Sequence, residues 1–267
     1  MSCAQGRDAE LTYEAFAPAY DEFTAHYDHE LWLGNFLPKL EAHGLRRGGL
    51  LDVGCGTGKG FLPMIERGWE VTACDISPSM LALAKEKAGN SARLSVADMR
   101  DLPLYGQFDL VVALDDAVNY LLDSAELESA LGGLARNLGP GGLLMFDLNT
   151  LRSYRTFFAE TMVVERGGWR MTWRGQAAAD TPPGSICESR LQIERTDLSP
   201  NDATLGNASP HVHRQRHFPA EEVLTLLAAS GLECLDVFGH GADAIPQQPL
   251  DERIHQKAVF VARLQAG

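Results

Sequence analysis

The chain has 267 residues, of which 45% are hydrophobic and 22% are charged, proportions typical of a globular protein that can bury a sizeable core. Its formal net charge of −13 opposes binding to phosphate backbones, so we expect no nucleic-acid substrate. The sequence has neither a membrane-length apolar run nor the basic and apolar regions of a secretory signal, so we expect a cytoplasmic protein without a membrane partner.

The first segment, residues 11–43, is expected to be helical. Its aromatic residues follow one another in steps of three and four, which places them on one face of a helix; they are Tyr13, Phe16, Tyr20, Phe23 and Tyr27. Proline has no amide hydrogen and disfavours a helix interior. We therefore expect Pro18 to divide this segment into two helices.

Strands and helices are predicted to alternate between residues 49 and 149. The expected strands are 50–54, 70–76, 92–99, 108–116 and 141–149. The expected helices between them are 59–68, 77–89 and 124–139, with Ser77 as the N-cap of the second and Pro78 at its first position. Such alternation is typical of right-handed crossovers and a parallel sheet.

The pattern changes after Asn149. Residues 161–177, 185–198 and 211–218 alternate polar and apolar side chains, which predicts an antiparallel insertion. A helix at 219–231 and strands at 232–239 and 256–264 then complete the core. We predict an α/β fold: a doubly wound, mostly parallel, seven-stranded Rossmann-like sheet with N-terminal helices and a small antiparallel β insertion. Five scattered cysteines without a CxxC pair favour reduced thiols, and we expect no metal site.

The stretch "LLDVGCGTGKG" at residues 50–60 places glycines at positions 54, 56, 58 and 60, directly after the first strand. Exposed backbone at this point favours a ligand with a negative or polar group, and a nicotinamide dinucleotide or S-adenosylmethionine are the natural candidates. The dinucleotide pattern G-x-G-x-x-G is not satisfied, because Lys59 or Phe61 stands where its third glycine belongs. The glycine spacing therefore argues against a nicotinamide-dependent oxidoreductase.

The order D-x-G-x-G-x-G resembles motif I of the class I S-adenosylmethionine-dependent methyltransferases. Four further stretches resemble that family in the same order: "VTACDIS", "VADMRDLP", "FDLVVALDDAVNYL" and "LGPGGLLMFDLNT". The resemblance covers about residues 45–150. It implies a helical lid at 1–45, a cofactor-binding core at 46–155 and 218–267, and an insertion at 156–217 that roofs the acceptor site.

The resemblance also implies which residues bind the cofactor. Asp75 would accept the ribose hydroxyls, Ile76 would contact the adenine face, and Asp98 and the Met99 amide would bond the adenine edge. The remaining implied contacts, with the methionine part or its ammonium group, are Tyr20, Asp52, Gly54, Cys55, Gly56, Gly58 and Leu114. For three of these positions a structural role stays open: a helix cap for Asp75, a core position for Ile76 and a turn cap for Asp98.

Catalytic and acceptor-binding residues are expected on the lid, after the fourth strand and on the insertion. Tyr13 and His213 are the catalytic candidates, although an aromatic packing role for Tyr13 and an ordinary core or surface role for His213 stay open. Asp115, Asp116 and Asn119 are the acceptor-binding candidates, with solvated loop acids as the alternative.

The function implied is methyl transfer from S-adenosylmethionine to a small molecule. The acidic charge and the two adjacent aspartates favour an amine nitrogen, and an O-methyltransferase with a histidine base is the alternative. The missing Asn-Pro-Pro-Tyr motif, replaced by "DDAVNYL", argues against nucleic-acid bases and translation factors as acceptors. A non-catalytic module that binds S-adenosylmethionine is the alternative of another class.

Overall fold

A seven-stranded sheet forms the centre of the computed structural model, which describes residues 2–197 and 211–265. The strand order is β10-β11-β5-β4-β1-β2-β3. The strands are β1 (Gly49–Val53), β2 (Glu70–Asp75), β3 (Ala92–Val96), β4 (Phe108–Ala113), β5 (Leu138–Asn149), β10 (Leu232–His240) and β11 (Lys257–Leu264). Strands β1 to β5 pair in parallel, and β11 runs antiparallel to β5 and β10. The predicted doubly wound, mostly parallel sheet is confirmed.

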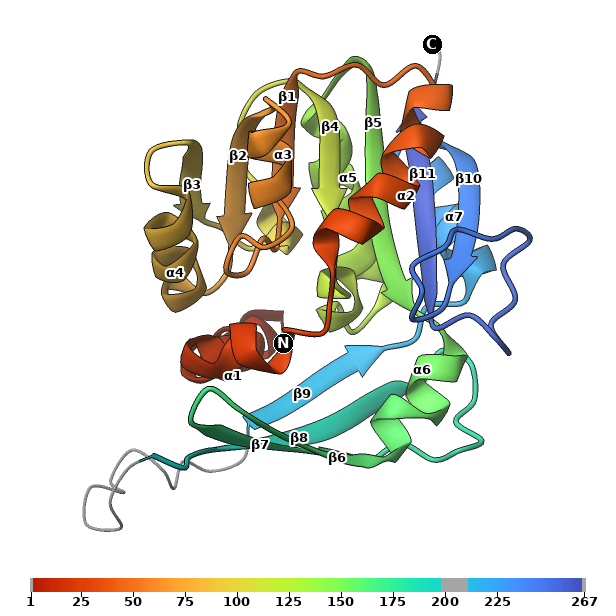
Figure 1. The fold of residues 1–267 in the computed structure, drawn as a ribbon. Helices are drawn as coiled ribbons and strands as arrows, with labels where there is room; N and C mark the ends of the chain where they lie inside the picture. Colours follow the sequence, from red (N-terminus) through yellow and green to blue (C-terminus); the bar gives the residue numbers. More distant parts are fainter. Residues whose placement is uncertain (1, 198–210, 266–267) are drawn as a thin grey trace.

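Helices cover both faces of this sheet (Figure 1). Adjacent residues of β1 face opposite sides: Leu50 packs with Phe36, whereas Leu51 packs with Leu127. Burial on both faces explains the nearly continuous apolar run of the strand. One face carries α2 (His29–Ala42), α3 (Leu62–Glu66) and α4 (Pro78–Ala88), and the other carries α5 (Ser124–Arg136) and α7 (Ala220–Ala229).

Side-chain caps fix where these helices begin. The Ser77 hydroxyl accepts a hydrogen bond from the Met80 amide at 3.2 Å, and Pro78 is the first residue of α4, as the sequence predicts. The Asp28 carboxylate caps α2 in the same way, accepting from the Leu31 amide at 2.9 Å.

The expectation that Pro18 divides the N-terminal segment is wrong. Helix α1 (Ser2–Phe23) continues through Pro18, and the break between the two helices falls at residues 24–28, where Asp28 starts the next helix. Proline removes a single amide donor from a helix. Burial of Phe16 and Ala19, which are 3% and 0% exposed, holds the helix on the protein on both sides of that position.

A second sheet lies beyond the carboxyl ends of the parallel strands, and α1 lies between the two (Figure 1). Its strands pair antiparallel in sequence order: β6 (Thr161–Arg166), β7 (Trp169–Gly175), β8 (Ile186–Arg195) and β9 (His211–Arg216). Short helices α6 (Leu151–Arg155) and η3 (Phe157–Ala159) lead into it. Phe16 and Phe23 of α1 pack with Met171 and Trp173 of this sheet. The predicted antiparallel insertion is confirmed, and residues 198–210 of it lie outside the described residues.

Among the described residues, no helix is long and apolar enough to cross a membrane.

Candidate active site

A pocket opens at the carboxyl ends of β1, β2 and β4, where the strand order reverses. It encloses about 900 Å³ of space, including solvent at its mouth, which is within the range of small-molecule sites. The predicted site residues that line it are Tyr13, Tyr20, Gly54, Cys55, Gly56, Asp75, Ile76, Asp98, Met99, Leu114 and Asp115. The predicted residues outside the lining are Asp52, Gly58, Asp116, Asn119 and His213.

The glycine-rich turn after β1 forms one wall of the pocket. Gly54 has φ +78°, and a side-chain carbon there would lie 2.8 Å from Cβ of Ala117. A larger residue would therefore close the gap between the turn and the segment that follows β4. Gly58 is required for another reason: a carbon added there would lie 2.7 Å from the ring of Phe61, so this glycine packs against the core and not against the pocket.

Asp75 ends β2 and is 8% exposed. Its Oδ2 accepts from the Gly56 amide at 2.8 Å, and its Oδ1 accepts from the Ser77 amide at 2.9 Å. Burial raises the pKa of this carboxyl, although those backbone hydrogen bonds oppose the rise. Each carboxylate oxygen keeps a lone pair for a ligand. The carboxylate of Asp75 is therefore fixed at the pocket wall by the backbone on both sides of it.

Asp98 serves as a turn cap and also lines the pocket. It accepts from the Arg100 amide at 3.0 Å at the start of η1 (Met99–Asp101), and the Arg100 guanidinium contacts both of its oxygens. Burial alone would raise the pKa of Asp98, but the hydrogen bonds from Arg100 outweigh it and hold the pKa below its usual range. Asp98 thus has the turn-cap role that the sequence left open, and its contact with adenine stays a prediction.

Asp52 is a buried carboxylate, 4% exposed, behind the glycine turn. A carbon added at pocket-lining Gly60 would lie 3.6 Å from its Oδ2 and 3.8 Å from the His29 ring. We find no hydrogen-bond donor to Asp52 among the described residues. Burial, with repulsion from Asp115 and Asp75, raises its pKa to about 8. This carboxylate therefore lacks a compensating positive group of its own.

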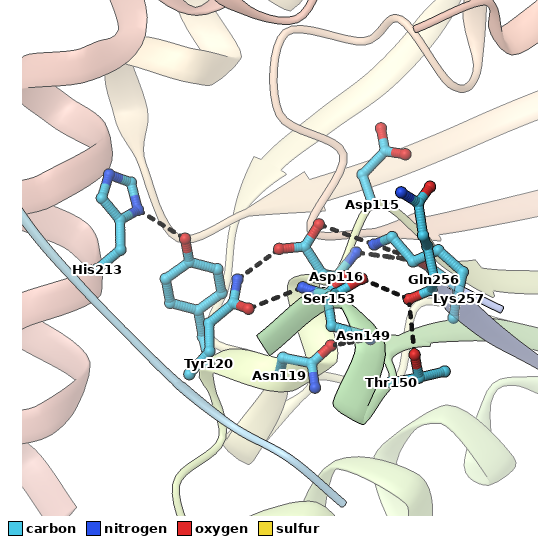
Figure 2. Close-up of polar contacts among 12 residues, drawn as sticks. Asp115, Asp116, Asn119, Tyr120, Asn149, Thr150, Ser153, His213, Gln256 and Lys257 are labelled. Atoms are coloured by element: carbon cyan, nitrogen blue, oxygen red, sulfur yellow. Dashed lines mark hydrogen bonds and ion pairs between the residues drawn. The ribbon is translucent and has the colours of Figure 1, made fainter. Parts of the chain in front are cut away.

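The two adjacent aspartates after β4 point to different places. Both have left-handed backbones, with φ +59° for Asp115 and +57° for Asp116. Asp115 lines the pocket and is bonded to His29 Nε2 at 2.7 Å. Asp116 turns away toward Lys257, as Figure 2 shows, and accepts from Lys257 Nζ at 3.0 Å. It also accepts from the side-chain amide of Gln215. The prediction of a paired acidic patch therefore resolves into one acid at the pocket and one in a buried network.

Asn119 is fully buried in η2 (Ala117–Tyr120) and both ends of its amide are bonded. Its Nδ2 donates to the Arg216 carbonyl at 2.8 Å, and its Oδ1 accepts from the Asn149 amide at 2.8 Å. Asn119 thus ties β9 to β5 and lies outside the pocket lining.

Three side chains from distant segments meet beside the pocket. The Tyr13 hydroxyl donates to the Tyr120 hydroxyl at 2.8 Å, and that hydroxyl lies 2.7 Å from Nδ1 of His213. Burial raises the pKa of both Tyr13 and Tyr120 well above the usual value of a phenol, so both hydroxyls stay protonated. Burial, with His211 nearby, lowers the pKa of His213 to about 3, so its ring is neutral.

Comparison with known proteins shows which proteins the chain resembles in sequence and fold. Residues 50–142 match the family described as a methyltransferase domain. A solved S-adenosylmethionine-dependent methyltransferase from Clostridium acetobutylicum ATCC 824 has the same fold, with a TM-score of 0.77, 21% identity, and coverage of 95% of this chain and 99% of that one. Residues 50–142 therefore form a methyltransferase domain, and the chain as a whole has the fold of S-adenosylmethionine-dependent methyltransferases.

Two further relatives match this methyltransferase over most of its length. YqeM, a provisionally assigned methyltransferase of Bacillus subtilis (strain 168), is 28% identical over 252 residues, covering 93% of this chain and 97% of its own. The structure of the sugar N-methyltransferase KedS8 from Streptoalloteichus sp ATCC 53650 has a TM-score of 0.69 and 26% identity, covering 92% of this chain and 93% of that one.

The residues of the methyltransferase fit its cofactor, S-adenosylmethionine. The molecule carries an ammonium and a sulfonium charge. The buried carboxyl group of Asp52, which has no cationic partner among the described residues, lies behind the turn at which such charge would be bound and would be ionised by it. The glycine turn leaves space that a side chain would fill, and Asp75 keeps acceptor capacity for hydroxyl groups.

Sequence reasoning missed two residues that contact the aspartates after β4. His29, the partner of Asp115, lies at the start of α2, and a histidine directly after a capping aspartate gave no signal of its own. Lys257 contacts Asp116 and Asp147 at the start of the apolar strand β11. A lysine at the edge of a buried strand, opposite buried acids, is the signal that could have identified it.

Proposed function

We propose that this methyltransferase methylates an amine nitrogen of a small molecule. The observation that carries this proposal is the carboxylate of Asp115, which lines the pocket together with Tyr13, Tyr20 and Tyr120. Burial would raise the pKa of Asp115, but its hydrogen bond to His29 and the nearby charges lower it, so the group is an anion at neutral pH. A fixed anion attracts a cationic amine and accepts a hydrogen bond from its N–H.

We propose the cofactor contacts that the family resemblance implies. Asp75 would bind the ribose hydroxyls, and Ile76 would contact the adenine face. Asp98 and Met99 would bond the adenine edge. The turn residues Gly54, Cys55 and Gly56, the Leu114 backbone, Tyr20 and Asp52 would surround the methionine part, and Gly58 would act by shaping the turn. These assignments rest on the family resemblance, on the pocket lining and on the absence of a cationic partner for Asp52 among the described residues.

Methyl transfer from the bound cofactor is an in-line displacement of its sulfonium by a lone pair of the acceptor. The protein has to align the acceptor and exclude water. In this proposal residues 1–45 act as the lid and the second sheet as the roof, because α1 lies between that sheet and the ends of the parallel strands. Tyr13 of α1 is the lid residue proposed to contact the acceptor.

An amine is favoured over a hydroxyl because, once a bound ammonium group has lost its proton to water at the mouth of the pocket, the amine offers a nucleophilic lone pair and needs no base during the transfer itself. A hydroxyl acceptor needs a base to remove its proton during transfer. His213, the histidine considered for that task, lies outside the pocket lining and has a pKa of about 3. The relative KedS8 is described as a sugar N-methyltransferase, which agrees with an amine acceptor.

The test is a matched pair of acceptor panels with deuterated-methyl S-adenosylmethionine and mass spectrometry of the products. One panel holds small amines and free amino sugars, and the other holds the same molecules with a hydroxyl in place of the amine. We expect labelled products from the amine panel alone. We also expect Asp115→Asn to raise the KM of the amine by roughly 10-fold or more while the affinity for S-adenosylhomocysteine changes little. Products from the hydroxyl panel alone would assign the protein as an O-methyltransferase.

A further inference from the structure

The contact between Tyr13, Tyr120 and His213 joins three segments that are far apart in the sequence. Tyr13 comes from α1, Tyr120 from η2 after β4, and His213 from β9 of the second sheet. Figure 2 shows the His213 ring directed at the Tyr120 hydroxyl. Tyr13 and Tyr120 line the pocket, whereas His213 is 2% exposed and lies behind them. The chain of contacts therefore begins in the buried sheet and ends at the pocket.

The surroundings of His213 indicate which nitrogen carries the proton. Its Nε2 is buried and has no hydrogen-bond partner. The ring lies among aromatic rings, with centroids 5.3 Å away for Trp173, 5.8 Å for Tyr13 and 5.9 Å for Phe16. Aromatic faces are negative, so they accommodate an N–H better than a lone pair. A proton on Nε2 leaves Nδ1 as an acceptor, and the Tyr120 hydroxyl must then donate to it.

This protonation state fixes the direction of both hydrogen bonds, from Tyr13 to Tyr120 and from Tyr120 to His213. When Tyr120 donates to His213, its oxygen is left to accept from the Tyr13 hydroxyl, which is the direction of that 2.8 Å contact. The hydrogen of Tyr13 is then engaged away from the pocket. What Tyr13 presents to the pocket is an oxygen lone pair.

We propose that His213 and Tyr120 are positioning residues that hold the Tyr13 hydroxyl as a hydrogen-bond acceptor for the N–H of the acceptor amine. An amine that donates an N–H to Tyr13 has its orientation fixed, so that its lone pair can be directed at the methyl group. This inference rests on the proposed function. It assigns His213 a role at the acceptor site without requiring that the ring touch the acceptor or take up a proton.

The charged groups nearby keep the side chains of Tyr13, Tyr120 and His213 neutral. Asp116 raises the pKa of both tyrosines in addition to their burial, and Lys257 opposes this effect at Tyr120 only in part. Burial and the nearby His211 disfavour a second proton on the His213 ring. The directed chain therefore persists across the neutral pH range.

The kinetic test uses two replacements of His213 that differ in a single property. His213→Asn keeps an acceptor oxygen near the position of Nδ1, and His213→Leu removes it. We expect His213→Leu and Tyr120→Phe each to lower kcat for the amine about 10-fold or more, with unchanged affinity for S-adenosylhomocysteine. His213→Asn should retain kcat within about 3-fold, and the Tyr120→Phe/His213→Leu double variant should be no slower than the worse single variant.

Tyr154→Phe is the matched control. Tyr154 is also a buried tyrosine, and its hydroxyl contacts the Gln215 amide oxygen and the Arg216 carbonyl of β9, but it does not line the pocket. We expect its kcat to stay within about 2-fold of the unmodified protein, whatever its effect on thermal stability. The proposal would be overturned if His213→Asn, His213→Leu and Tyr154→Phe lost kcat equally and in parallel with a lowered Tm. The hydrogen bonds among Tyr13, Tyr120 and His213 would then have only a structural role.

A measurement that needs no methyl-accepting substrate separates this inference from the proposed function. In ¹⁵N spectra of histidine-labelled protein, with His213→Asn to assign the signal, we expect a neutral ring protonated at Nε2 throughout pH 5–8. A ring protonated at Nδ1, or one that titrates near its ordinary pKa of about 6.5, would overturn the inference directly. If His213 is found neutral with its proton on Nε2 but no amine is methylated, the direction of the hydrogen bonds from Tyr13 through Tyr120 to His213 stands. Their role in orienting an amine and the proposed function then both fail.

Discussion

Binding of the cofactor should release a proton from Asp52. The pKa of this carboxyl is about 8 because it is buried and repelled by Asp115 and Asp75. At pH 7 a group with that pKa is protonated to about 0.9, and at pH 9 to about 0.1. A ligand cation beside it that lowers the pKa well below 6 should make binding at pH 7 release about 0.9 proton. Affinity should then rise about 9-fold from pH 6 to pH 7 and about 5-fold from pH 7 to pH 8, where the free carboxyl is already half ionised.

The assay is calorimetric titration of S-adenosylhomocysteine in buffers of different ionisation enthalpy at pH 7 and pH 9. Comparison with Asp52→Asn cancels the proton exchange of the ligand itself, and Asp180→Asn, at an exposed position of the same charge, serves as the control. Equal proton release from the unmodified protein and Asp52→Asn would refute the reasoning. That result would mean that the carboxylate is already ionised in the free protein, or does not sense the ligand.

Three more outcomes follow from the contacts described. Asp75→Ala should weaken S-adenosylhomocysteine binding by about 2 kcal/mol or more in the same calorimetric assay. If the unmodified protein binds NAD more tightly than S-adenosylhomocysteine, that result would contradict the cofactor assignment. Gly58→Ala should lower the free energy of unfolding, measured in urea, by roughly 1–3 kcal/mol, because φ is +86° and the ring of Phe61 lies 2.7 Å from the added carbon. The control Gly89→Ala, at φ +58° and with open space around it, should lower the free energy of unfolding by less. Lys257→Met should cost about 3–5 kcal/mol at pH 8, because the buried carboxylate of Asp147 and the half-buried one of Asp116 lose their cation. The cost should be smaller at pH 5, because burial raises the pKa of Asp147 to about 6 and this carboxyl can take up a proton there; an equal cost at both pH values would contradict this explanation.

The sequence predicted the core of the fold because its signals are local. Ser77 and Pro78 mark a helix start within two residues, and the glycines follow β1 directly. The turn after β1 and the carboxyl end of β2 must meet, since parallel neighbouring strands end at the same edge of a sheet. That rule alone brings Gly56 and Asp75 within hydrogen-bond distance, as the 2.8 Å contact confirms.

The contacts that the sequence could not predict join residues far apart in the chain. His29 and Asp115 are separated by 86 residues, and Tyr120 and His213 by 93. Each depends on how α2 and β9 dock on the core, which no local pattern specifies. The continuation of α1 through Pro18 has the same origin, because tertiary burial outweighed a local preference.

The turn after β4 shows how two identical neighbouring residues come to do different things. A left-handed backbone at a residue other than glycine costs of order 1–3 kcal/mol, and this turn has two in succession. The strain is held from both sides: Asp115 by His29 of α2, and Asp116 by Lys257 of β11 and Gln215 of β9. Because Asp116 is anchored to the second sheet, the turn that presents Asp115 to the pocket is set in part by that sheet. The second sheet and the acidic wall of the pocket are therefore coupled through a single peptide turn.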